Sequence, residues 1–189
     1  MKTDIVLCGV GGQGILSIAT VIGQAATRAG LALKQSEVHG MSQRGGDVQS
    51  HLRLSDERLW SDLIPEGCAD LIISMEPMEA LRYLPYLSPS GRIITASAPF
   101  VNIPAYPDAQ DLSSQLKACG AIVIDIDALA RKAGSPRSAN MVLLGAASAY
   151  IGLLDAETLR SAVAEVFARK GEAVVASNVK AFDLGISQL

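Results

Sequence analysis

Two glycine-rich segments contain the groups with which this chain could do chemistry. The first, GVGGQG, follows a short apolar run and precedes a helical pattern. Its spacing fits G-x-G-x-x-G, a turn that brings a bound phosphate close to the free N–H groups of a helix start. The same turn also occurs as a tight packing corner that binds nothing, so both interpretations stay open. The candidate contacts in this segment are Gly9, Gly11, Gly12, Gln13 and Gly14.

Two classes of nucleotide site share parts of this pattern. A dinucleotide site needs an acidic residue about 20 positions after the glycines to hold a ribose, and Glu37 is a candidate for that role. The extra glycine at Gly12 also makes the segment similar to the GxGGxG loop of ubiquitin-activating-type adenylating enzymes. Those enzymes usually have a zinc-binding CxxC pair, which this sequence lacks.

The second segment, SEVHGMSQRGGDVQSHLRLS, spans residues 36 to 55 and is dense in polar groups. Arg44 stands beside two glycines, and a guanidinium next to exposed N–H groups suits a carboxylate or a phosphate. The alternative is that Arg44 pairs with an acid across the sheet. In that case His39 would only cap a loop. The candidate contacts in this segment are His39, Ser42, Gln43, Arg44, Gly45 and Gly46.

Two other polar residues have open assignments. Asn140 precedes an apolar helical stretch, where it would either cap that helix or face the same cleft. His51 alternates onto the polar face of residues 47–54, which predicts a position on the surface or at an interface.

Predicted strands alternate with predicted helices over most of the chain. We expect a turn at 55–58, with Leu59 and Trp60 starting a hairpin partner, and a turn at 88–91. The predicted strands are 4–8, 31–38, 47–54, 69–75, 92–97 and 121–126. The predicted helices are 12–29, 77–83, 111–120, 127–134, 141–153, 155–169 and 172–184, the last closed by Gly185.

This order predicts a single domain over residues 1–189 with an α/β fold. We expect a three-layer sandwich with a mostly parallel, mixed sheet, a Rossmann-like glycine-rich first turn and a helical C-terminal region. The composition agrees, because 49% of residues are hydrophobic and only 4% are aromatic. An aliphatic core of that kind suits strands buried on both faces.

Charge, cysteine usage and hydropathy exclude several classes of function. The net charge is −3 without blocks of like charge, so nucleic acid and anionic membrane are poor partners. The three cysteines lie far apart and form no metal-binding spacing. The longest apolar stretch, 141–154, is shorter than the ~20 residues that span a bilayer and is expected to be a core or interface helix. With no signal peptide at the N-terminus, the expected location is the cytoplasm.

Taken together, these segments resemble a known family. The chain is similar to the gamma subunit or domain of 2-oxoacid:ferredoxin oxidoreductases over about residues 4 to 185. Within that family it most resembles the small beta subunit of the indolepyruvate type. The segments that carry the resemblance are GVGGQG, SEVHGMSQRGGDVQSHLRLS, LIPEGCADLIISMEPMEALRYLPYL, GSPRSANMVLLGA and NVKAFDLG.

The resemblance implies a shared chemistry. Such enzymes oxidatively decarboxylate a 2-oxoacid, pass the electrons to ferredoxin and transfer the acyl group to coenzyme A. It implies that a larger partner subunit carries thiamine diphosphate, Mg and the iron–sulfur clusters, and that this chain alone binds no cofactor. The loops Gly9–Gly14 and His39–Gly46 would form part of the wall of the shared site, with Arg44 as the anion contact. No catalytic residue is expected in this chain.

Two alternatives remain beside this assignment. The chain could be a stand-alone oxidoreductase that binds NAD or FAD at its first glycine loop. It could also be a purely structural or regulatory subunit without contacts to the active site.

Overall fold

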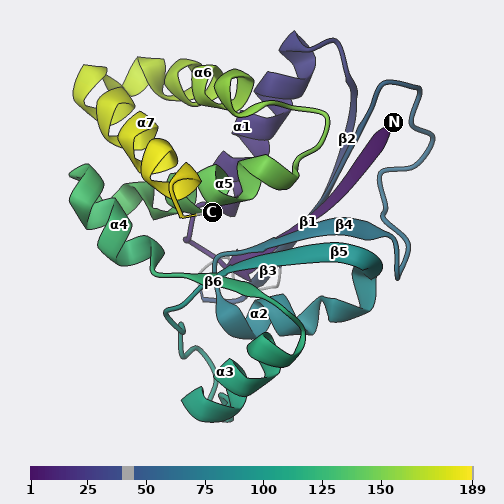
Figure 1. Cartoon of the computed structure of the whole chain (residues 1–189), viewed down its shortest axis with the longest axis vertical. Coiled ribbons are helices and arrows are strands. Elements are labelled where there is room, and N and C mark those ends of the chain that lie inside the picture. The colour runs from purple at the N-terminus through teal and green to yellow at the C-terminus, as the bar shows by residue number, and fades with distance from the viewer. Residues whose placement is uncertain (40–44, 189) are drawn as a thin grey trace.

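Six strands form one sheet within the residues that the computed structural model describes, 1–39 and 45–188 (Figure 1). They are β1 (Lys2–Val10), β2 (Ala32–His39), β3 (Asp47–Ser55), β4 (Ala69–Ser74), β5 (Leu87–Ala96) and β6 (Ile122–Ile124). Their order is β2-β3-β1-β4-β5-β6. β3 pairs antiparallel with β1 and β2, whereas the pairs β1–β4, β4–β5 and β5–β6 are parallel. The predicted mixed, mostly parallel sheet is confirmed.

Helices cover both faces of this sheet, which confirms the three-layer sandwich (Figure 1). One face is covered by α1 (Ile15–Arg28), α4 (Ile126–Ala133), α5 (Ala139–Ala147), α6 (Ala156–Phe167) and α7 (Glu172–Ile186). The other face is covered by α2 (Pro77–Arg82) and α3 (Ala109–Ala118). Short 3-10 turns are η1 (Leu84–Tyr86), η2 (Pro136–Ser138), η3 (Ser148–Tyr150) and η4 (Ala168–Lys170).

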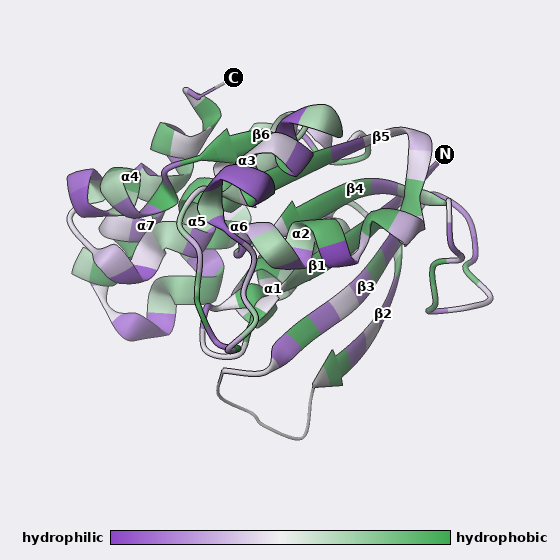
Figure 2. Ribbon diagram, turned by 90° about the horizontal axis from the view of Figure 1, so that it is seen from below, coloured by the Kyte–Doolittle hydropathy of each residue, from purple (hydrophilic) through white to green (hydrophobic). Residues whose placement is uncertain are grey.

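The sequence patterns of the strands match their positions in the sheet. β1 and β4 lie in the middle and are buried on both faces, so they read as continuous apolar runs. β3 mixes polar and apolar residues, which Figure 2 shows as bands of both colours. α1 buries residues at helical spacing, with Ile15, Ile18 and Ile22 against the sheet.

Two glycines allow α5 and α7 to cross at very close range. A Cβ atom at Gly145 would lie 2.0 Å from the carbonyl oxygen of Phe182, and one at Gly185 would lie 2.0 Å from that of Val142. The prediction that Gly185 closes its helix is therefore wrong: α7 continues to Ile186, and Gly185 is a packing glycine inside it. Its role depends on a neighbour in another helix, which the local pattern does not contain.

The first part of the apolar stretch 141–154 lies in the core, where α5 is buried along its whole length. Farther along the stretch, Ala149 and Gly152 are exposed. Among the described residues, no helix is both long enough and apolar enough to cross a membrane.

One predicted turn and one predicted strand start differ from the structure. Residues 88–91 are part of β5, and the pairing with β4 shifts register between Ala69 and Leu71 to accommodate this segment. Leu59 and Trp60 start no strand, and Trp60 is 79% exposed with the Arg58 guanidinium 4.0 Å from its ring centroid. β3 needs no hairpin partner there because β1 and β2 occupy both of its edges.

His51 is buried, so the prediction of a surface or interface position is wrong. Its side chain is only 6% exposed, and its Nδ1 accepts a hydrogen bond from the N–H of Ile64 at 3.0 Å. The Tyr86 ring packs edge-on against it, with 5.0 Å between centroids. The segment that follows β3 and the turn η1 cover this face of β3, which alternation within the strand does not reveal.

The burial of His51 makes the stability of the fold depend on pH. Burial lowers the pKa of His51 below 6.5, and Arg53 lowers it further against the opposing charges of Asp4 and Asp62. The unfolded chain therefore binds a proton at a pH where the folded chain does not. The contribution of neutral His51 is complete above about pH 6.5 and is lost as the pH falls towards its folded-state pKa.

We therefore expect His51→Phe to flatten the acid side of the stability profile. The measurement is urea unfolding of both proteins at about pH 7.5 and about pH 5.5. The wild type should lose more unfolding free energy between these conditions than the variant, whatever their absolute stabilities. Equal losses would contradict a neutral His51 in the folded chain.

Candidate functional site

The candidate site lies where β1 and β4 end side by side. α1 follows β1 on one face of the sheet, and α2 follows β4 on the other face. In open α/β sheets, ligands bind in the crevice outside the strand ends at such a switch of faces. The first glycine loop and residues Met75 and Glu76 lie at this crevice.

Gln13 fastens the two strand ends to each other. Its Oε1 accepts a hydrogen bond from the N–H of Val10 at 2.7 Å, and its Nε2 donates one to the carbonyl oxygen of Met75 at 3.2 Å. A Cβ atom at Gly9 would lie 2.8 Å from Gln13 Oε1 and 3.0 Å from Met75 Cβ. Position 9 must therefore be glycine, because any side chain there would keep Gln13 from bonding to both strands.

The two glycine-rich loops lie against each other. The N–H of Gly11 donates to the carbonyl oxygen of Gly46 at 2.8 Å, and the N–H of Gly45 donates to that of Gly11 at 3.4 Å. The structure thus brings the two segments that the sequence analysis selected into contact at Gly11, Gly45 and Gly46. Ser42, Gln43 and Arg44 lie outside the described residues, as does the side chain of His39. Their contacts with a ligand stay a prediction.

Asn140 faces the first glycine loop instead of capping its own helix. Its Nδ2 donates to the carbonyl oxygen of Gly14 at 3.0 Å, whereas the N-cap position of α5 is Ser138. Gly14 has a φ of 85°, and a Cβ atom there would lie 2.6 Å from Asn140 Nδ2. Of the two assignments left open for Asn140, the structure favours the one that faces the cleft.

A cavity of about 730 Å³ opens beside this loop. Its floor is formed by Gly12–Gly14 together with the ends of β4 and β5, and its other walls come from residues 98–100, α4, η2, η4 and α7. Asn140 lies in its lining together with Gln13. Segments far apart in the sequence therefore form one pocket of the size that small-molecule ligands occupy, about 300–1,000 Å³.

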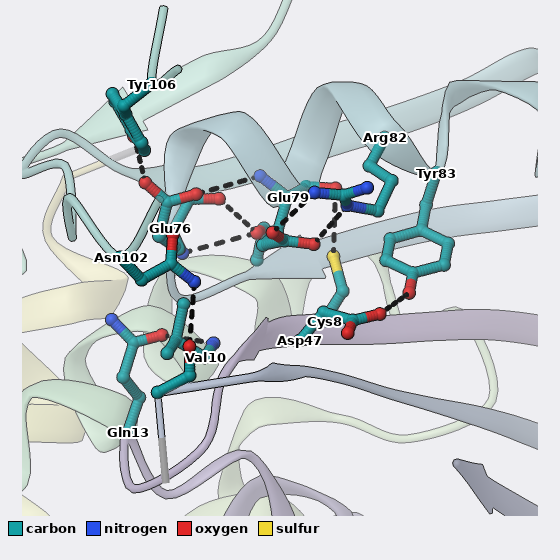
Figure 3. A network of polar contacts seen from close by, with 12 residues as sticks. Cys8, Val10, Gln13, Asp47, Glu76, Glu79, Arg82, Tyr83, Asn102 and Tyr106 are labelled. Carbon is teal, nitrogen blue, oxygen red and sulfur yellow. Dashed lines mark hydrogen bonds and ion pairs between the residues drawn. The ribbon is translucent and has the colours of Figure 1, made fainter. Parts of the chain in front are cut away.

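Glu76 is a buried carboxylate at this site that the sequence analysis did not select. It is the N-cap of α2, and its Oε2 accepts a hydrogen bond from the N–H of Glu79 at 2.9 Å. Its Oε1 accepts from the N–H of Phe100 at 3.2 Å and from the hydroxyl of Tyr106 (Figure 3). An acid directly before Pro77 at a helix start signals a cap in the sequence. Nothing in the sequence signals the contacts with residues 100 and 106.

The segment that Glu76 holds also reaches the second glycine loop. Asn102 Nδ2 donates to the carbonyl oxygen of Gly45 at 2.9 Å. Residues 97–107 thus contact Glu76 through Phe100 and Tyr106, and contact Gly45 through Asn102, which lies between them in the chain. Glu76 therefore positions one wall of the cavity and, through Asn102, the second loop.

Burial disfavours the ionised forms of the other reactive groups near Glu76. Burial raises the pKa of the Cys8 thiol and of the Tyr106 hydroxyl, and the Glu76 carboxylate raises the pKa of Tyr106 further. Burial also raises the pKa of Glu79, against the Arg82 guanidinium that binds it at 2.8 Å. These groups are suited to structural hydrogen bonds, not to nucleophilic attack.

Metal-binding side chains do not gather in the part of the chain that the structure describes. No group of three or more His, Cys, Asp or Glu residues there could hold a metal ion. Cys8 is buried, Cys68 is exposed and Cys119 lies at the C-cap of α3. This donor set does not fit an iron–sulfur cluster, which needs several cysteines around one point.

Comparison with known proteins identifies the family. The sequence profile of the family "Pyruvate ferredoxin/flavodoxin oxidoreductase" matches residues 4–188. This chain belongs to the pyruvate ferredoxin/flavodoxin oxidoreductase family. The resemblance seen in the sequence segments is thereby confirmed.

Within the pyruvate ferredoxin/flavodoxin oxidoreductase family, several curated relatives match over nearly their full length. Indolepyruvate oxidoreductase subunit IorB of Archaeoglobus fulgidus is 36% identical, covering 100% of this chain and 96% of the relative. The IorB subunit of Pyrococcus horikoshii is 37% identical, covering 97% and 94%. That of Methanothermobacter thermautotrophicus is 39% identical, covering 86% and 87%.

Solved structures of the same family agree with the fold. A 2-oxoglutarate:ferredoxin oxidoreductase from Magnetococcus marinus, with 2-oxoglutarate, coenzyme A and succinyl-CoA bound, matches with a TM-score of 0.74 at 27% identity. This chain is covered to 98% there but spans only 30% of that longer chain. The gamma subunit of a keto/oxoacid ferredoxin oxidoreductase from Geobacter sulfurreducens matches with a TM-score of 0.70 at 25% identity, covering 98% and 97%.

Proposed function

We propose that this chain is the small subunit of a 2-oxoacid:ferredoxin oxidoreductase that acts on indolepyruvate or a related aryl pyruvate. The observation that carries the proposal is the similarity to IorB subunits, 36–39% identical over nearly their whole length. Matches to ketoisovalerate and 2-oxoglutarate enzymes are weaker, at 24–28% identity. The aryl substrate is therefore preferred to the aliphatic ones.

The proposed reaction divides the work between subunits. The 2-oxoacid loses carbon dioxide, its two electrons pass through iron–sulfur clusters to ferredoxin, and the acyl group is transferred to coenzyme A. Thiamine diphosphate, Mg and the clusters would be held by a larger partner subunit. The scattered cysteines and the protonated Cys8 thiol support that division, because they offer no cluster ligands in the described residues.

In this complex, which we place in the cytoplasm, the chain would supply part of the wall of the active site. Backbone N–H groups of the first glycine loop and the Arg44 guanidinium would contact anionic groups of the 2-oxoacid or of coenzyme A. The hydrogen bonds between Gly11, Gly45 and Gly46 support this role, because they hold the two residues that follow Arg44 in the sequence against the first glycine loop. The binding of those anions would orient the reactants.

Arg44→Ala tests this role in the assembled complex. Loss of a charge-assisted contact of about 1.5–3 kcal/mol should lower kcat/KM about 10- to 100-fold. The measurement is steady-state reduction of ferredoxin with varied indolepyruvate and varied coenzyme A. The matched control is Arg92→Ala, which removes an exposed arginine of β5 and should leave both constants unchanged.

The same assay separates the alternative functions. A purely structural subunit predicts that Arg44→Ala leaves kcat/KM for both reactants intact. A stand-alone oxidoreductase predicts that the purified chain oxidises a substrate without a partner or retains a flavin or nicotinamide. Either result would replace the proposed function.

A further inference from the structure

The single tryptophan of this chain is exposed to solvent instead of packed in the core. Trp60 lies in the connection between β3 and β4, residues 56–68, and is 79% exposed. Tryptophan is large and on average highly buried in folded proteins. Leu63 in the same connection is 56% exposed. One short segment thus presents two large apolar side chains to solvent.

An anchored backbone carries these side chains. The Arg53 guanidinium binds the fully buried Asp4 carboxylate twice, with Nε donating to Oδ1 at 2.8 Å and Nη2 donating to Oδ2 at 3.1 Å. Its Nη1 donates to the carbonyl oxygens of Ser61 at 3.2 Å and of Leu63 at 2.9 Å. The buried ion pair therefore fixes the guanidinium, and the guanidinium fixes the connection.

Contacts on either side complete this arrangement. After Leu63, the buried Ile64 donates its N–H to His51 Nδ1 at 3.0 Å. Before it, the Arg58 guanidinium lies 4.0 Å from the centroid of the Trp60 ring. A segment that is already ordered loses little conformational entropy when a partner binds it. Tryptophan and arginine are also the residue types that contribute most to binding at protein interfaces.

The same connection carries an excess of exposed acidic side chains. Glu57, Asp62 and Glu66 are exposed, and none of them forms a salt bridge within the part of the chain that the structure describes. Arg58 is the single basic residue among residues 56–68. A complementary partner therefore has basic side chains around an apolar pocket. A second copy of this chain fits badly, because a two-fold contact would bring the two acidic sets together.

This connection lies at the end of the sheet away from the two glycine-rich loops. The N–H of Asp56 donates to the carbonyl oxygen of Met1 at 3.3 Å, and β1 runs from there to the first glycine loop. Figure 1 shows the connection between β3 and β4 beside the N-terminus. A partner bound at Trp60 would therefore leave the candidate site open.

We propose that Arg58, Trp60 and Leu63 form a docking surface for the larger subunit of the complex, which receives the indole ring in an apolar pocket with basic residues around it. Two longer relatives support a polypeptide partner. The part that matches this chain makes up 36% of one ketoisovalerate oxidoreductase subunit and 30% of the Magnetococcus marinus chain. There the same unit is covalently joined to further polypeptide, whereas a separate chain must hold its partner through a surface. The identity of the partner rests on the proposed function.

Calorimetric titration of the purified larger subunit with the full chain tests this surface. Trp60→Ala should raise Kd about 30-fold or more, and it should leave the Tm of the free chain unchanged because the side chain is exposed. Glu57→Lys should slow association and reduce the loss of affinity on addition of salt. The matched control is Val123→Ala, which shortens an exposed apolar side chain on β6 and should leave Kd unchanged.

The outcomes can be told apart from those of the proposed function. With the larger subunit at saturation, Trp60→Ala should keep the wild-type kcat/KM, because Trp60 lies away from the candidate site. The proposal is overturned if Trp60→Ala binds as tightly as the wild type or if kcat/KM falls at saturation. It is also overturned if the chain alone forms a dimer that Trp60→Ala dissociates, which would make a second copy the partner. A complex that depends on Trp60 but turns over no 2-oxoacid would count against the proposed function and support this surface.

Discussion

Gly145→Ala is expected to destabilise the fold by about 3 kcal/mol or more, although alanine is the better helix former. In an exposed helix the substitution would stabilise by about 0.8–1.0 kcal/mol. Here the new Cβ atom would lie 2.0 Å from the carbonyl oxygen of Phe182, a backbone atom that moves only if α7 moves. Overpacking therefore outweighs helix propensity, and the sign of the effect reports the close crossing of α5 and α7.

The measurement is thermal and urea unfolding of the purified chain, with an expected fall in Tm of about 6–12 °C. Gly152→Ala is the matched control, because the nearest atom to its Cβ would be Thr3 Oγ1 at 3.9 Å. That control should change stability by less than about 1 kcal/mol. A Gly145→Ala protein as stable as the wild type would mean that the two helices do not cross at this distance.

Glu76→Ala is the second substitution with a large expected effect, a loss of roughly 3 kcal/mol. It removes the acceptor for Glu79 N, Phe100 N and the Tyr106 hydroxyl in one step. Residues 97–107 would lose their anchor, and the Asn102 contact with Gly45 would loosen with them. We therefore expect reduced hydrogen-exchange protection at the Phe100 amide and a lower kcat/KM in the assembled complex.

Two control variants distinguish the hub from an ordinary buried residue. Glu76→Gln keeps one carbonyl acceptor and should recover part of both the stability and the kcat/KM. Glu66→Ala removes an exposed glutamate from the loop before β4 and should be neutral. If Glu76→Ala destabilised the fold but left exchange at Phe100 and kcat/KM unchanged, Glu76 would have no role in positioning residues 97–107.

Local patterns were sufficient for most elements of the fold. The strand β4, the start of α2 at Pro77 and the start of α6 after Asp155 depend on residues that are neighbours in the chain. These signals are apolar runs, a proline at N1 and an N-cap aspartate. Each acts within one turn or one strand, so it predicts the element without knowledge of the tertiary structure. The glycine loop and its place before α1 belong to the same group.

Sequence patterns also predicted that the two glycine-rich segments form one site, through the resemblance of both to the same family. The hydrogen bonds of Gly11 with Gly45 and Gly46 bring these two segments into contact. The role of Arg44 in that site stays a prediction, because Arg44 lies outside the described residues.

Local sequence patterns did not predict the roles of residues whose partners are distant in the chain. Gly185 packs on Val142, His51 bonds to the N–H of Ile64, and Asn140 bonds to Gly14. In each case the residue is buried or hydrogen-bonded by a segment far away in the sequence, which the local hydrophobic pattern cannot reveal. A residue type and its spacing therefore predict a helix or a turn, whereas the charge, solvation and reach of a side chain follow from what the folded chain packs against it.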